Sequence, residues 1–191
     1  MQALTQISSG FRAQFLRPWM RRSLAHGVYA TLFLGAIVGI SNPAQANPQG
    51  LEGHYLGGGI SVGATSGGQT DDGQALGGNV QGRVDIPNAP VSLRGSVIFT
   101  EDNAAFVPMI SYDLAVNDRT NIYAGGGASL LLDGGKTTPI GNRDAFAVTA
   151  GVETGLTDKL AVYGDVKWGI NAYEKSPADA LSIQMGAAYR F

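Results

Sequence analysis

The last eleven residues of the chain alternate strictly between two kinds of side chain. In the stretch Leu181–Phe191 the odd positions are apolar, whereas the even positions are small, polar or charged. Successive side chains of a β-strand point to opposite faces, so a period of two predicts a strand with one apolar and one polar face. Such a strand belongs in an all-β domain, which is either soluble or embedded in a membrane.

Seven more segments with strand-like composition precede this one, at the short spacing of an all-β domain. Each has about the 9 to 11 residues with which a tilted strand crosses a bilayer. Pro108 lies inside the fourth segment, and because proline has no N–H to donate, we expect a β-bulge there or a later start of the strand. The predicted strands are residues 54–64, 76–86, 91–100, 105–116, 120–132, 143–156, 159–171 and 180–191.

The predicted connections alternate in length along the chain. The longer ones are residues 65–75, 101–104, 133–142 and 172–179, and the shorter ones are residues 87–90, 117–119 and 157–158. Long external loops and short periplasmic turns are typical of an outer-membrane barrel. A soluble sandwich has no reason to alternate in this way.

The aromatic residues gather near the strand ends once the apolar face is taken to meet lipid. Aromatic rings are enriched where a membrane meets water, so the sequence predicts two aromatic girdles. The external girdle contains Phe99, Phe106, Phe146 and Trp168, and the periplasmic girdle contains Tyr112, Tyr189 and Phe191.

The opposite face of the predicted strands carries charge. Charged side chains are tolerated there only in a wet or mutually paired interior. Because eight strands leave an interior just wide enough for side chains to fill, we expect an ion-paired plug and not a water-filled pore. The inward residues, four positive and four negative, are Arg83, Asp85, Arg94, Asp113, Glu153, Asp165, Lys167 and Arg190.

The amino-terminal part of the chain has the features of a secretory signal peptide. No acidic residue precedes Glu52, an apolar run covers residues 27–40, and Ala44 and Ala46 form an Ala-x-Ala cleavage site. We therefore expect a signal peptide at residues 1–46, a short periplasmic lead-in at 47–53 and a barrel at 54–191. Translation starting at Met20 gives a leader of ordinary length, and an amino-terminal anchor helix is the alternative.

Charge and composition exclude several classes of function. Removing the leader takes away four arginines and no acid, so 9 basic residues oppose 15 acidic ones and the net charge changes from −2 to about −6. Nucleic-acid binding needs a basic face, so we expect no nucleic-acid partner. The chain has no cysteine, which excludes disulfides, thiolate metal sites and cysteine nucleophiles.

Three weaker motifs suggest chemistry. His54, the one histidine after the leader, pairs with a serine such as Ser61 in a hypothetical lipid hydrolase. Residues 134–137 have the composition of the end of a phosphate-binding loop but lack its first glycine and following helix. Asp71, Asp72 and Asp102 suggest a divalent ion at the external rim, although they lack the fixed spacing of a calcium loop. We expect no catalytic, cofactor-binding or metal-binding residue.

Together, the leader, the eight strands, the two girdles and the ending Tyr189-Arg190-Phe191 resemble the small outer-membrane β-barrel family of the opacity, OmpA and OmpX type. The resemblance implies an eight-stranded antiparallel up-and-down transmembrane barrel of a Gram-negative-type bacterium, exported through the Sec pathway. It implies that Tyr189 and Phe191 form the signal read by the barrel-assembly machinery. Its partners are then outer-membrane lipid, that machinery and periplasmic chaperones, and we expect a monomer without a cofactor.

The leading functional hypothesis is a non-enzymatic barrel with a structural, envelope-integrity or surface-contact role and a lumen plugged by paired charges. External loops shorter than is usual in this family favour the structural role over adhesion. A narrow porin-like channel for ions or small solutes is the alternative. A membrane-embedded lipid hydrolase and a soluble secreted β-domain are further ones.

Overall fold

The computed structural model of the protein describes residues 50–67, 75–133 and 136–191. The predicted signal peptide with Met20, Ala44 and Ala46 lies outside the described residues, as do residues 47–49, 71–72 and 134–135. Within the described ranges there is no helix long and apolar enough to cross a membrane.

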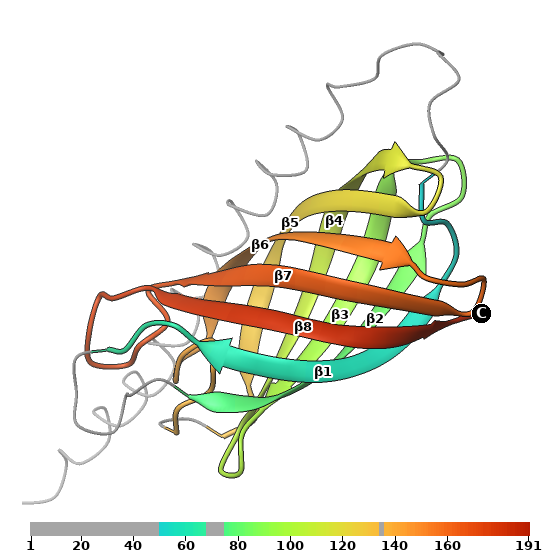
Figure 1. Ribbon diagram of the computed structural model, residues 1–191. Helices are drawn as coiled ribbons and strands as arrows, with labels where there is room; N and C mark the ends of the chain where they lie inside the picture. The colour runs from blue at the N-terminus through green and yellow to red at the C-terminus, as the bar shows by residue number, and fades with distance from the viewer. Residues whose placement is uncertain (1–49, 68–74, 134–135) are drawn as a thin grey trace, which may run out of the picture. The chain divides into compact units, whose positions relative to one another are not determined.

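The described residues form eight antiparallel strands that close into a barrel, with β1 hydrogen-bonded to both β2 and β8 (Figure 1). The predicted all-β barrel is confirmed, and each predicted strand boundary lies within two residues of the observed one. The strands are β1 (Tyr55–Gly63), β2 (Leu76–Asp85), β3 (Val91–Phe99), β4 (Ala104–Asn117), β5 (Thr120–Leu131), β6 (Ala145–Gly155), β7 (Leu160–Ile170) and β8 (Ala180–Arg190).

The strands are staggered around the barrel. The stagger can be followed by stepping from Tyr55 on β1 to its paired residue on each next strand until the path returns to β1. Gly63 pairs with Ser182, and the same register two residues farther on pairs Thr65 with Ala180. The path therefore returns to β1 at Thr65, ten residues along the strand from its start (65 minus 55). Stagger of this kind accompanies strongly tilted strands and an interior that side chains fill. The path runs through Arg83, Arg94, Met109, Gly127, Ala147, Gly169 and Ala180.

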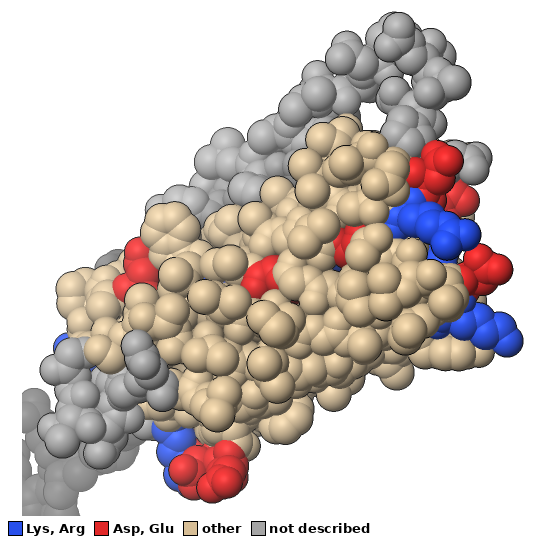
Figure 2. Space-filling view, in the orientation of Figure 1, with Lys and Arg blue, Asp and Glu red and all other residues tan. Residues whose placement is uncertain are grey.

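The two faces of the barrel wall differ in chemistry. Large apolar side chains such as Leu93, Val152 and Met185 lie on the outside, and each has about half of its surface exposed. Figure 2 shows a wall that is mostly uncharged, with Lys, Arg, Asp and Glu gathered mainly toward its two ends. The charged residues of the eight strands have the inward parity, so the outer wall presents an apolar band of the kind that meets lipid.

The expected irregularity at Pro108 does not occur there. β4 begins four residues earlier, and its register with β3 and with β5 is the same on both sides of the proline. The bulge lies instead between Ala115 and Asn117, next to the turn. Gly127 on β5 lets the two strands approach at the proline, because a β-carbon on Gly127 would overlap the Pro108 carbonyl oxygen.

The barrel has two different ends. The terminal end carries the described lead-in Gly50–His54, the carboxy-terminal Phe191 and the short connections 86–90, 118–119 and 156–159. The loop end carries the longer connections 64–75, 100–103, 132–144 and 171–179. At the terminal end the tight turns use side-chain oxygens in place of backbone acceptors: Asn117 Oδ1 accepts from Arg119 N, and Thr157 Oγ1 accepts from Leu160 N.

Described parts of the longer connections fold over the loop end and are tied to one another. Ile140 is fully buried among inward residues of β3, β4 and β6. Tyr173 donates from its hydroxyl to the Thr65 carbonyl at 3.0 Å, and the Glu174 N–H donates to Asn142 Oδ1 at 2.9 Å. The loop end of the lumen is therefore closed by an apolar plug beneath a hydrogen-bonded cap.

Candidate functional site

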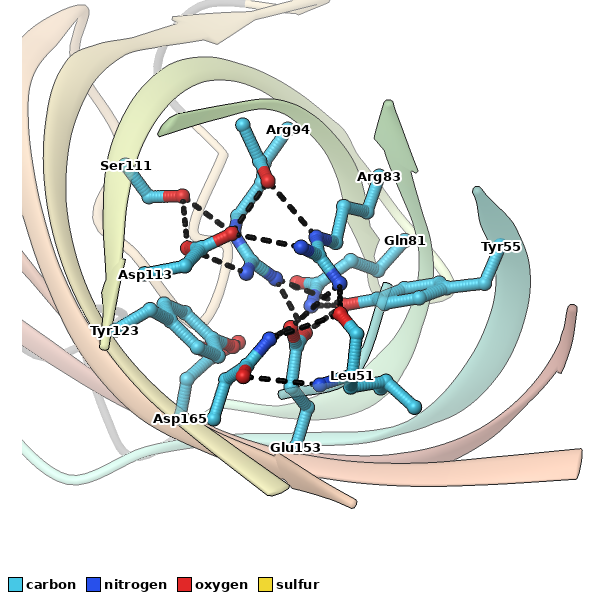
Figure 3. Close-up of polar contacts among 12 residues, drawn as sticks. Leu51, Tyr55, Gln81, Arg83, Arg94, Ser111, Asp113, Tyr123, Glu153 and Asp165 are labelled. Carbon is cyan, nitrogen blue, oxygen red and sulfur yellow. Dashed lines mark hydrogen bonds and ion pairs between the residues drawn. The ribbon is translucent and has the colours of Figure 1, made fainter. Parts of the chain in front are cut away.

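Four charged residues from four strands meet inside the terminal half of the barrel (Figure 3). We call Arg83 on β2, Arg94 on β3, Asp113 on β4 and Glu153 on β6 the ionic cluster. Each is at most 8% exposed. Their inward direction follows from the period of two in each strand, and the stagger of the strands brings them to one level of the lumen.

Glu153 is the centre of the cluster. Its carboxylate accepts from Arg94 Nη1 at 2.8 Å and forms an ion pair with Arg83 Nη1 at 2.9 Å. The Tyr55 hydroxyl at 2.9 Å and Asn121 Nδ2 at 3.1 Å complete its surroundings. Four side chains from four different strands therefore converge on one buried carboxylate.

Asp113 is the second anion between the two guanidinium groups. It lies 3.0 Å from Arg83 Nη2 and 2.9 Å from Arg94 Nη2. It also accepts from Ser111 Oγ at 2.8 Å and from Ser92 Oγ. Removing charges from water is costly, and charge-assisted hydrogen bonds of this kind offset that cost only when the geometry is good.

The cluster balances a like-charge contact. Arg83 and Arg94 are direct cross-strand partners, an arrangement that destabilises a sheet unless other charges intervene. Arg83 donates to Ser92 Oγ, the Leu51 carbonyl and Asp85, and it forms ion pairs with Asp113 and Glu153. The guanidinium carbon of Arg94 lies 3.6 Å from the centre of the Tyr123 ring, which adds a cation–π contact.

A second ion pair lies farther along the lumen, between Lys167 and Asp165 on β7. Their charged atoms are 2.6 Å apart and both side chains are completely buried. The other two ammonium protons go to Gln81 Oε1 and Gln184 Oε1, each at 3.1 Å. The Tyr123 hydroxyl donates to Asp165 at 2.8 Å and so joins this pair to the ionic cluster.

The lead-in closes the terminal mouth of the lumen. Leu51 is 2% exposed, its N–H donates to Asn121 Oδ1 at 3.0 Å, and its carbonyl accepts from Arg83 Nη1 at 2.6 Å and Asn121 Nδ2 at 2.9 Å. With Ile140 at the loop end, buried side chains lie at both mouths of the lumen and between them. The arrangement is suited to rigid closure.

The other predicted inward charges lie at the terminal rim. Asp85 bonds Arg83 at 3.2 Å but keeps 23% of its side chain exposed. Arg190 does not join the network, because it sits at the end of β8 and its long side chain reaches backbone carbonyls of the rim. It donates to the Glu52 carbonyl at 2.8 Å and the Thr157 carbonyl at 3.3 Å.

The aromatic residues predicted for the girdles all lie on the outer wall. Five are 41% to 74% exposed, namely Phe99, Phe106, Trp168, Tyr189 and Phe191. Tyr112 and Phe146 are half-buried. Phe99 and Phe106 are diagonal neighbours across β3 and β4 near the loop end, while Tyr112 and Tyr189 lie toward the terminal end.

Several residues of the site were not singled out from the sequence. Tyr55, Tyr123 and Asn121 share the inward parity of the charges, so the same period of two identifies them. Leu51 and Ile140 lie in irregular segments, where no periodicity indicates which way a side chain points.

The weaker candidate motifs do not form sites among the described residues. His54 accepts at Nδ1 from the Asp85 N–H and packs against Phe191, whereas Ser61 bonds Ser182 about 20 Å farther along β1. Lys136 lies 3.9 Å from Asp133 with both side chains mostly exposed. In residues 50–67, 75–133 and 136–191 no group of three His, Asp or Glu residues is placed to hold a metal ion.

Comparison with known proteins gives one family. The family model described as "Outer membrane protein beta-barrel domain" matches residues 30–191. No curated protein matches the chain.

Among solved structures, Neisserial surface protein A has a TM-score of 0.52 at 14% identity, over 73% of this chain and 98% of that one. This likeness shows the fold alone. Ail, the attachment invasion locus protein of Yersinia pestis, was crystallised with the heparin analogue sucrose octasulfate. It has a TM-score of 0.48 at 16% identity, over 74% of this chain and 100% of that one. A de novo designed transmembrane β-barrel has a TM-score of 0.49 at 15% identity, over 73% of this chain and 96% of that one.

Proposed function

This chain belongs to the outer membrane protein β-barrel domain family, and on that premise we propose that it is a non-enzymatic barrel that supports the outer membrane. Its role is mechanical: it anchors a rigid, closed cylinder in the membrane and holds a compact cap at the surface. Surface contact through that cap is the second role within the same proposal.

The observation that carries the proposal is the filled lumen. The ionic cluster, the Lys167–Asp165 pair, Leu51 at one mouth and Ile140 at the other are all buried in the described interior, and the charged groups among them bond one another. A channel needs charges that line an opening, whereas these charges bond one another across it. This packing supports closure over conduction.

The cap supports a structural role in the same way. Described residues of the longer connections bond one another, as Asn103 does when its amide donates to the Asp133 carbonyl at 2.6 Å and the Lys136 carbonyl at 2.7 Å. Loops tied to one another present a fixed surface and have little freedom to wrap around a partner. The separation of His54 from Ser61 supports a non-enzymatic role.

The proposal includes a route and an orientation. Family membership places the protein in the outer membrane. We infer Sec export by a leader ending at Ala46, assembly guided by Tyr189 and Phe191, and a monomer surrounded by lipid. The loop end then faces outward and the terminal end faces the periplasm, as expected for long and short connections.

The test is a strain that lacks the gene, complemented with either of two forms. One is the wild-type protein, and the other carries Glu101→Gln, Asp102→Asn and Glu174→Gln at exposed positions of the loop end. The readouts are entry of a hydrophobic dye into whole cells and adhesion to a solid surface.

A structural role predicts that loss of the protein increases dye entry and that both forms restore the barrier equally. A surface-contact role predicts that adhesion falls and that only the wild type restores it. Unchanged dye entry together with unchanged adhesion in the deletion strain contradicts the proposal.

A further inference from the structure

The described lead-in crosses the terminal mouth of the barrel. It enters β1 at Tyr55, yet Leu51 bonds Asn121 on β5. In the closed barrel of eight, three strands lie between β1 and β5 on either side, so β5 forms the opposite wall. The segment Gly50–Gly53 therefore spans the mouth and does not hang from its edge.

Three walls of the mouth hold this segment. Arg83 on β2 and Asn121 on β5 bond the main chain of Leu51. Asp85 accepts from the Gly53 N–H at 3.3 Å, and Arg190 on β8 donates to the Glu52 carbonyl. These contacts, except Asn121's, come from charged side chains, which make stronger hydrogen bonds to peptide groups than neutral ones do.

The mouth is also shaped for this particular sequence. Gly50 has φ of 75°, and a β-carbon there would overlap Asn121 Oδ1 and lie 2.9 Å from Ala115 Cβ. The Leu51 side chain fills the space beside Gly155 on β6, where a β-carbon would lie 2.9 Å from Leu51 Cδ1. The pocket therefore accepts a glycine followed by a branched aliphatic residue.

We propose that Gly50–Gly53 is a built-in lid: a peptide ligand carried by the chain itself, bound by a peptide site at the terminal mouth of the lumen. The ligand is a short peptide in which a small residue is followed by a branched aliphatic residue, and the site binds the main-chain N–H and carbonyl of the aliphatic residue. The lid shields the ionic cluster from the periplasmic side. This inference rests on the proposed function, in which Leu51 closes one mouth of the lumen.

The absence of cysteine from the chain allows a direct test. Leu51→Cys and, as the matched control, Glu52→Cys are each made in the full chain, recovered from outer membranes and exposed to a membrane-impermeant maleimide. Residue 52 is exposed and residue 51 is buried. The lid predicts that the cysteine at 51 reacts at no more than about one tenth of the rate of the cysteine at 52. Urea unfolding should abolish the difference.

Release variants test the pocket. Gly50→Val or Gly155→Val, each combined with Leu51→Cys, is expected to raise the reaction rate to that of the cysteine at 52. Gly164→Val in the same background is the control, because a β-carbon at Gly164 has its nearest neighbour at 3.7 Å. A variant has folded if boiling slows its mobility on a gel. Two release variants are used so that the test remains valid if one of them does not fold.

Equal reaction rates at 51 and 52 in the otherwise wild-type protein overturn the lid, whether or not the barrel conducts ions. So does protection that persists in every folded release variant. Protection of residue 51 in a barrel that conducts ions upholds the lid and contradicts the closed lumen of the proposed function, so the two failures are distinguishable.

Discussion

Replacing Glu153 with glutamine tests whether the ionic cluster holds the barrel together. The wild-type cluster contains two guanidinium groups and two buried carboxylates, so Glu153→Gln leaves two positive charges and one negative charge within the cluster. The new amide nitrogen also faces donors, because both carboxylate oxygens accept hydrogen bonds in the native structure.

Removing one partner of a buried ion pair costs about 3–5 kcal/mol. With a urea m-value of about 1–3 kcal/mol/M for a domain of this size, that cost lowers the unfolding midpoint by at least about 1 M. The assay is urea unfolding of the barrel in lipid vesicles, followed by the fluorescence of Trp168, which is half exposed on the outer wall.

The matched control is Asp158→Asn, which neutralises an exposed acid in a turn at the same end and is expected to change stability by about 0.5 kcal/mol or less. Arg94→Met with Glu153→Met removes one charge of each sign, so the double variant should be less destabilised than the sum of the two single changes. A Glu153→Gln barrel as stable as the Asp158→Asn barrel refutes the reasoning, as does strict additivity in the double variant.

Three other substitutions and one mass measurement have expected outcomes. Lys167→Met leaves Asp165 buried without its counterion and should cost about 3 kcal/mol or more in the same urea assay, part of which Asp165→Leu should restore; no loss contradicts the buried pair. Gly127→Val should prevent β4 and β5 from pairing and so abolish the faster band of the unboiled protein on gels, whereas the control Gly164→Val should keep that band. A folded Gly127→Val barrel contradicts the close approach of the two strands at Pro108. Ile140→Ala should lower the free energy of unfolding by about 2–5 kcal/mol, and the outward change Leu132→Ala by much less; equal effects argue against the apolar plug. The intact mass of protein from outer membranes should match a chain that begins at Asn47, and a chain that retains residues 1–46 contradicts the cleavage site.

The fold follows from the sequence to an unusual extent because its main signal is local. A period of two assigns each side chain to a face without reference to any other strand, as in Leu181–Phe191, and the same parity puts Arg94 and Glu153 inside. Side chains such as Asn117 and Thr157 locate the tight turns by the hydrogen bonds they make.

The parts that sequence did not predict depend on register and on irregular backbone. Parity puts Arg83 inside, but only the pairing of β2 with β3 shows that its direct neighbour is Arg94, and only the curvature of the barrel brings Glu153 across to both. Leu51 and Ile140 close the two mouths from segments without periodicity. The prediction of a bulge or a later strand start at Pro108 was wrong, because β4 continues through the proline without a change in register.

Planar-bilayer conductance of the purified wild-type barrel tests the central claim most directly. A lumen filled by the ionic cluster, the Lys167–Asp165 pair, Leu51 and Ile140 predicts a silent bilayer in which heat-modifiable protein is present and no unitary current steps occur. Reproducible unitary steps that scale with the amount of folded barrel contradict the closed lumen and favour the narrow channel.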